Sequence, residues 1–163
     1  MNLSMGRKEK IFLAFYRSFS SIFVYIGVIA LAGYYLFAHT SEPFLGLNLA
    51  ISTYFDYLYA SSNQIIFLIL AHVVTIIGGL AYVIGGYFSK RGYLTSLLIS
   101  SGAYLLDLVL LVVIYNFKYI TLSNFISSLI VHSAFLLMML FAIYAFIFLY
   151  RHGLAEKSNL EGK

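Results

Sequence analysis

The sequence contains no cysteine and no tryptophan, and only 10% of its 163 residues are charged. The missing cysteines exclude disulfide bridges, thiolate zinc sites and cysteine-ligated iron–sulfur clusters within this chain. The low charge excludes an ordinary water-soluble domain, in which about 25% of residues are charged. The lack of cysteine, together with many isoleucines and tyrosines, also suits a thermophile.

Hydrophobic residues make up 62% of the chain, against about 45–50% in soluble domains. A soluble core of this size could not bury so much apolar surface, so lipid must solvate most of it. The sequence therefore predicts one all-α integral membrane domain, residues 1–163, with the lipid bilayer as a partner. The net charge of +4 comes from basic residues at the ends of apolar segments, which indicates topology rather than nucleic-acid binding.

Four apolar runs approach or exceed the ~20 residues that a helix needs to cross a bilayer. The predicted spans cover residues 18–38, 65–88, 94–115 and 125–150. Of the ten Lys and Arg residues, nine fall on one side of these spans and only Lys118 falls on the other. This asymmetry predicts a multi-pass plasma-membrane protein with both termini in the cytoplasm.

The connections between the spans predict an up-down four-helix bundle. The short "SKRGY" connection makes the second and third spans antiparallel neighbours, but the first external connection, residues 39–64, is much longer. "SEP" at residues 41–43 predicts a helix start. Asn48, Ser52 and Asp56 then recur every four residues, which predicts an external amphipathic helix on the outer membrane face. Such a helix would be a lid on the bundle or the roof of a lipid-accessible site.

Three ionisable side chains interrupt the apolar spans: His72, Asp107 and His132. An Asp, Lys or Arg at the centre of a membrane helix costs ~2.5–3.5 kcal/mol on insertion scales, so such residues mark functional sites by default. At 1.5 Å per residue, all three should lie roughly 10–12 Å below the outer edge of the hydrocarbon.

Small, hydroxyl-bearing and aromatic side chains accompany these residues at helical spacing, as at helix–helix contacts in membranes. All three ionisable side chains are therefore expected to point into the bundle. The stripes are His72, Thr75, Gly79, Tyr82 and Gly86; Ser96, Ser100, Tyr104 and Asp107; and Ser128, His132, Phe135 and Met139.

A haem b held by two histidines is one hypothesis for this layer. In an up-down bundle the second and fourth spans lie roughly 12–14 Å apart across the diagonal. His72 and His132 would ligate the iron, Gly78 or Gly79 would leave room for the ring edge, and Asp107 or a hydroxyl would orient an imidazole.

A quinone site is the competing hypothesis. Histidine and aspartate can exchange protons with a quinone during its reduction, and an aromatic side chain such as Tyr104 can stack on the ring. The same residues could also only hydrogen-bond helices together, or form a proton or ion pathway. A copper or di-iron centre is disfavoured, because the chain has no Glu-x-x-His pair.

The segment "GGLAYVIGGYFSKRGYLTSLLI", residues 78–99, resembles the DoxX/DoxD-like small four-helix membrane proteins. The resemblance rests on a Gly-Leu…Gly-x-x-x-x-Arg pattern and on an arginine before the first span. The matching residues are Gly79, Leu80, Gly86 and Arg91, with Arg17 before the first span. This resemblance implies a membrane subunit of a quinone-linked oxidoreductase, as in thiosulfate:quinone oxidoreductase.

These observations predict a membrane-embedded electron-transfer or quinone-interacting subunit of a respiratory-type complex, working with other membrane subunits. The alternative is a non-catalytic accessory subunit of a larger membrane assembly. A small-solute or proton transporter is disfavoured, because the four spans show no inverted repeat or broken helix. Whether the chain is itself an enzyme is left open.

Overall fold

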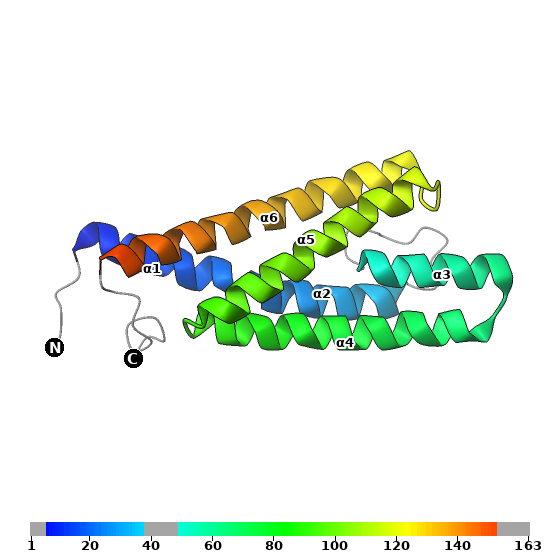
Figure 1. The fold of residues 1–163 in the computed structure, drawn as a ribbon, viewed down its shortest axis with the longest axis horizontal. Helices are drawn as coiled ribbons and strands as arrows, with labels where there is room; N and C mark the ends of the chain where they lie inside the picture. The colour runs from blue at the N-terminus through cyan, green and yellow to red at the C-terminus, as the bar shows by residue number, and fades with distance from the viewer. Residues whose placement is uncertain (1–5, 38–48, 153–163) are drawn as a thin grey trace.

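The computed structural model describes residues 6–37 and 49–152, and every regular element in these ranges is a helix (Figure 1). The six helices follow one another along the chain with short connections, except between α2 and α3. They are α1 (Arg7–Ser20), α2 (Ile22–Phe37), α3 (Ala50–Ser62), α4 (Ile65–Lys90), α5 (Leu94–Asn116) and α6 (Leu122–Arg151).

Four helical stretches are long and apolar enough to cross a membrane. They are Arg7–Leu36, which comprises α1 and α2, and then α4, α5 and α6. All four stretches carry large apolar side chains on their outer surface, where only lipid can solvate them favourably. The chain is therefore a membrane protein with a bundle of four membrane-length helices.

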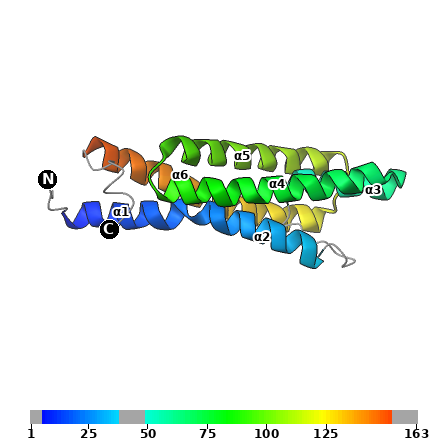
Figure 2. The ribbon, with the colours of Figure 1, turned by 90° about the horizontal axis from the view of Figure 1, so that it is seen from below.

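The predicted spans 65–88, 94–115 and 125–150 agree with α4, α5 and α6 to within three residues at each end. The first span differs, because its helix begins at Arg7 and is interrupted at Ser21. The Ser21 hydroxyl donates to the Ser18 carbonyl oxygen at 2.7 Å. Such bonds compete with the helical ladder and bend helices. The break lets α1 pack against α6 while α2 packs against α4 (Figure 2).

Glycines allow α2 and α4 to pack backbone against backbone. A Cβ atom on Gly27 of α2 would meet the Gly79 carbonyl oxygen of α4, and one on Gly86 would lie 2.6 Å from the Val24 backbone nitrogen. Close approach through small residues is the usual way in which membrane helices associate. Three residues after Gly86, the buried Tyr16 hydroxyl of α1 donates to the Ser89 carbonyl oxygen at 2.6 Å. These contacts fix α4 against the first span.

α3 and α4 form a helical hairpin and lie side by side (Figures 1 and 2). Asn63 ends α3 in the left-handed conformation, with φ of 52°, and its N–H donates to the Tyr59 carbonyl oxygen at 2.8 Å. From this turn α3 extends back along α4 until its first residue, Ala50, reaches α5.

Two polar residues of α3, Ser52 and Asp56, face the protein. The Thr75 hydroxyl of α4 donates to Ser52 Oγ at 2.7 Å, and the Tyr34 hydroxyl of α2 donates to Asp56 Oδ1 at 2.9 Å. The predicted external amphipathic helix stays a prediction; Ser52 and Asp56 of its polar stripe have partners on α4 and α2. The predicted helix start at residues 41–43, and Asn48, lie outside the described residues.

Gly86→Ala should destabilise the fold, because its Cβ atom would press on the Val24 backbone, which cannot move as a side chain can. Overpacking of this kind costs about 1–3 kcal/mol. Gly102→Ala on α5 is the matched control, since a Cβ there meets nothing within 4 Å. It should leave stability unchanged or raise it by up to about 1 kcal/mol. Reversible unfolding in mixed micelles measures both; equal effects would contradict the backbone contact.

Candidate functional site

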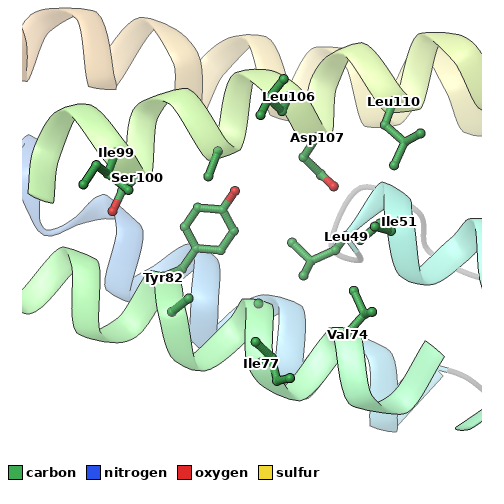
Figure 3. Close-up of a pocket in the computed structure, with 13 residues that line it drawn as sticks. Leu49, Ile51, Val74, Ile77, Tyr82, Ile99, Ser100, Leu106, Asp107 and Leu110 are labelled. Atoms are coloured by element: carbon green, nitrogen blue, oxygen red, sulfur yellow. The ribbon is translucent and has the colours of Figure 1, made fainter. Parts of the chain in front are cut away.

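A cavity of about 400 Å³ lies between α4 and α5, next to the first residues of α3 (Figure 3). Its volume is in the range of small-molecule sites, and its walls are mostly apolar. It is lined by Leu49, Ile51, Val74, Ile77, Gly78, Ala81, Tyr82, Ile99, Ser100, Ala103, Leu106, Asp107 and Leu110.

The cavity borders on the lipid-facing surface of the bundle. Three of its lining residues, Ile77, Ile99 and Leu106, are 63%, 73% and 69% exposed. In a membrane protein such side chains contact acyl chains. A ligand dissolved in the bilayer could therefore reach the cavity sideways, without passing through water.

Asp107 gives the cavity its one acidic group. The side chain is buried, and Figure 3 shows its carboxylate pointing from α5 into the space between the two helices. The Ala50 N–H donates to both carboxylate oxygens, at 3.0 and 3.2 Å. The first N–H groups of a helix have no partner within the helix and carry its positive dipole end. Asp107 therefore stabilises the N-terminus of α3 inside the bundle.

His132 of α6 lies on the other side of Asp107. Its Nε2 is 3.5 Å from Asp107 Oδ2, and its Nδ1 is 2.8 Å from the Ser128 carbonyl oxygen. A carbonyl oxygen can only accept, so Nδ1 carries a hydrogen. Nε2 is then the ring nitrogen that faces the carboxylate.

Two tyrosines complete the surroundings of this pair. Tyr104 stacks on the His132 imidazole, with ring centroids 5.2 Å apart and an angle of 20° between planes. Tyr82 lines the cavity, meets Tyr104 edge to face at 6.2 Å, and points its hydroxyl toward α5 (Figure 3). The predicted stacking role of Tyr104 therefore falls on the imidazole, and Tyr82 is the tyrosine that faces the cavity.

His72 does not join this pair. Its ring stacks parallel to Tyr35 at 5.7 Å and meets Tyr34 edge to face at 5.3 Å, both on α2. The contacts of α3 allow the depths of Asp107 and His72 to be compared. Ala50 of α3 contacts Asp107, and Ser52, two residues nearer the α3–α4 turn, contacts Thr75 of α4. His72 lies three residues before Thr75, nearer the turn again. The helical rise places His72 about 7 Å nearer the α3–α4 turn than Asp107. The expectation of one common depth and direction thus holds for Asp107 and His132 but not for His72.

This arrangement does not favour a haem between the two histidines. Both nitrogens of His132 face protein oxygens, and His72 lies against α2 rather than toward His132. Within residues 6–37 and 49–152, no group of three or more His, Cys, Asp or Glu residues could hold a metal ion. The haem b hypothesis stays a prediction.

Most of the predicted contact stripes are buried as expected. They include Thr75, Gly79, Tyr82 and Gly86 of α4, Ser100, Tyr104 and Asp107 of α5, and Ser128, His132 and Met139 of α6. Gly79 packs against α2, because a Cβ there would lie 2.5 Å from Leu31 Cγ. Its neighbour Gly78 lines the cavity, where a Cβ would lie 2.6 Å from Leu49 Cδ1.

Sequence reasoning missed the contributions of α3 and α2. Leu49 and Ile51 line the cavity, but both are apolar, so the sequence does not distinguish them from other lipid-facing or core residues. Tyr34 and Tyr35, which contact His72, were not among the predicted site residues. Tyr82 was predicted on the contact stripe of the second span, and its hydroxyl, which needs a partner, could have marked it as a cavity residue.

No protein-family model, curated protein or solved structure matches the chain. The resemblance to the DoxX/DoxD-like proteins stays a prediction. Function is therefore argued from the cavity and the residues around it.

The pH dependence of stability should report on Asp56. Burial raises the pKa of this carboxyl above its ordinary 3.8, and the Tyr34 hydrogen bond and the His72 imidazole offset only part of the rise. The folded state therefore holds the proton more tightly than the unfolded state. Stability should fall as pH rises from 3.8 through the folded-state pKa, and then level off.

Asp56→Asn should remove this fall, and Glu9→Gln at the exposed start of α1 should leave it in place. Thermal unfolding in detergent, measured between about pH 4 and 7, tests the difference. Stability of the original chain that rises with pH in this window would contradict the assignment.

Proposed function

We propose that the chain is a membrane subunit that binds a quinone in the cavity between α4 and α5, and that Asp107 and His132 exchange protons with the quinone head. The observation that carries this proposal is the position of Asp107. Its carboxylate lines an apolar, lipid-facing cavity and lies 3.5 Å from His132 Nε2. Few amphipathic ligands that reach a site through lipid need a proton-exchanging pair at their polar end, and quinones do.

The chemistry assigned to the pair is limited to protons. Reduction of a quinone to a quinol takes two electrons and two protons. The electrons would come from a redox centre of a partner membrane subunit, as a respiratory-type complex provides. One proton would come from the pair, and the second would follow after His132 and Asp107 are reprotonated. α3 would form the roof of this site, through Leu49 and Ile51.

The proposal includes an orientation, with an up-down bundle in the plasma membrane and both termini in the cytoplasm. The start of α1, the turn between α4 and α5, and the end of α6 lie toward the same end of the bundle (Figure 1). Basic residues such as Arg7, Lys90, Arg91 and Arg151 belong to these segments, and Lys118 belongs to the turn at the other end. Such an asymmetry supports a cytoplasmic location for the basic end.

Substitutions of Asp107 should separate binding from proton exchange. Asp107→Asn keeps an acceptor for the Ala50 N–H, so quinone binding should remain, but without a proton donor beside the head dithionite should reduce the bound quinone to quinol more slowly. Asp107→Leu removes the carboxylate from the cavity and should weaken binding on the order of tenfold. Binding is measured by retention of quinone in nanodiscs, and the rate of reduction by the ultraviolet absorbance of the quinone.

Asp56→Asn is the control, because this carboxyl contacts Tyr34 and does not line the cavity. It should change neither quinone binding nor the rate of quinone reduction. Equal quinone retention by all three variants, or none by the original chain, would overturn the proposal. A reduced-minus-oxidised spectrum with sharp haem bands would instead favour the haem b hypothesis.

A non-catalytic accessory subunit is the second candidate, and the bond from Ala50 to Asp107 favours it. That bond alone gives the buried carboxylate a structural task. In this case Asp107→Leu should accelerate hydrogen exchange at the Ala50 amide, and neither the original chain nor any variant should retain quinone.

A further inference from the structure

A second cavity, of about 410 Å³, adjoins the first along the same pair of helices. Three residues, Ala81, Ile99 and Ser100, line both cavities, so the two are contiguous. We call the combined space the α4–α5 groove. The second cavity is further lined by Gly85, Phe88, Tyr93, Thr95 and Ser96.

The two parts of the groove differ in polarity. The first part ends at Asp107 and Tyr82, which can bind a polar head. None of the residues that line the second part carries a charge. One of its hydroxyl groups has a partner within the protein, since Ser96 Oγ donates to the Gly85 carbonyl oxygen at 2.9 Å. The second part therefore offers space without a charged group.

A small side chain lies where the two parts adjoin, because Ala81 lines both of them. Ile99, on the opposite wall, is 73% exposed and borders on lipid. The groove is thus a lipid-facing channel with a polar end at Asp107.

We propose that the second part of the groove holds the isoprenoid tail of the ligand whose head lies at Asp107. The ligand class is then a long-chain quinone rather than a tail-less one. This inference rests on the proposed function. The continuity of the groove with the head site supports it, as does the uncharged lining of the second part.

The length of the groove sets the length of the tail. Asp107 and Ser96 are eleven residues apart on α5, which corresponds to about 16 Å, or about three extended isoprene units. A tail of this length would run along α4 and α5 toward the Lys90–Arg91 turn, beside Ala81 and Gly85. Longer tails would continue into the bilayer.

Two photoreactive quinones test the proposal in nanodiscs. One carries a diazirine on the head ring, and the other carries it at the end of a tail of about three isoprene units. Labelled residues are mapped by mass spectrometry. The head probe should label the residues around Asp107, and the tail probe should label the segment from Tyr93 to Ser100.

Thr95→Phe should fill the second part of the groove, because Thr95 lines this part and not the first. It should reduce labelling by the tail probe in this segment by about fivefold or more, and leave labelling by the head probe unchanged. Ala134→Phe, at an exposed position of α6, is the control and should change neither. Because Thr95 is itself exposed, the larger side chain should not prevent folding, and intact labelling by the head probe verifies this.

The outcomes separate the inference from the function on which it rests. Labelling by the head probe around Asp107 with tail labelling that is diffuse, or that Thr95→Phe leaves unchanged, would overturn the tail site alone. Failure of both probes to label the groove would overturn the proposed function as well. Displacement of the tail probe by phospholipid acyl chains at ordinary lipid ratios would also overturn the tail site, since the groove would then be a lipid site.

Discussion

The bond between the Ala50 N–H and the Asp107 carboxylate determines how this bundle is assembled. A helix that begins inside a bundle presents N–H groups without partners, and lipid supplies no acceptor for them. A buried carboxylate has the opposite need. Each group satisfies the other at 3.0 and 3.2 Å, and the bond fixes the first turn of α3 between α4 and α5. Leu49 and Ile51 are thereby held in the wall of the cavity.

The two sides of α4 are built differently, and this difference explains where the cavity lies. On one side, Gly79 and Gly86 bring the backbone of α4 against α2, with no room for a Cβ atom. On the other side, the larger α5 residues keep a separation that Ala81 and Gly78 do not fill. Rigid packing on one side lets the other side retain a space, because α4 cannot move to close it.

Hydropathy and charge were sufficient to predict the membrane-length helices, because apolar length is what the bilayer selects. Helical spacing was sufficient to predict the meeting of Asp107 with His132, since both belong to stripes that are otherwise small and polar. Spacing could not predict the direction of the His72 side chain. His72 lies at the edge of its stripe, where a small rotation of α4 about its axis decides whether the side chain faces α2 or the bundle centre. Spacing also could not reveal the break at Ser21, because a serine hydroxyl that bonds to its own helix leaves hydropathy unchanged.

The polar stripe of α3 illustrates why amphipathic patterns are ambiguous in membrane proteins. The spacing of Ser52 and Asp56 shows that one face is polar, but it does not say whether water or protein covers that face. In a water-soluble protein, the apolar face of a helix packs against the protein. In a protein surrounded by lipid, the polar face packs against the protein. Here Thr75 and Tyr34 supply the partners, so α3 packs with its polar face inward.

In the proposed quinone site, a proton shared by Asp107 and His132 would have a role that a purely structural pair would not need. The Ser128 carbonyl oxygen accepts from His132 Nδ1, so Nε2 is the ring nitrogen that faces Asp107. At that position the pair can donate a hydrogen bond while it holds the proton and accept one after the proton has left. A quinone oxygen changes in the complementary direction, from the acceptor of the oxidised ring to the donor of the quinol. A pair with one movable proton therefore matches both redox states of such a head, whereas a fixed donor or a fixed acceptor would match only one.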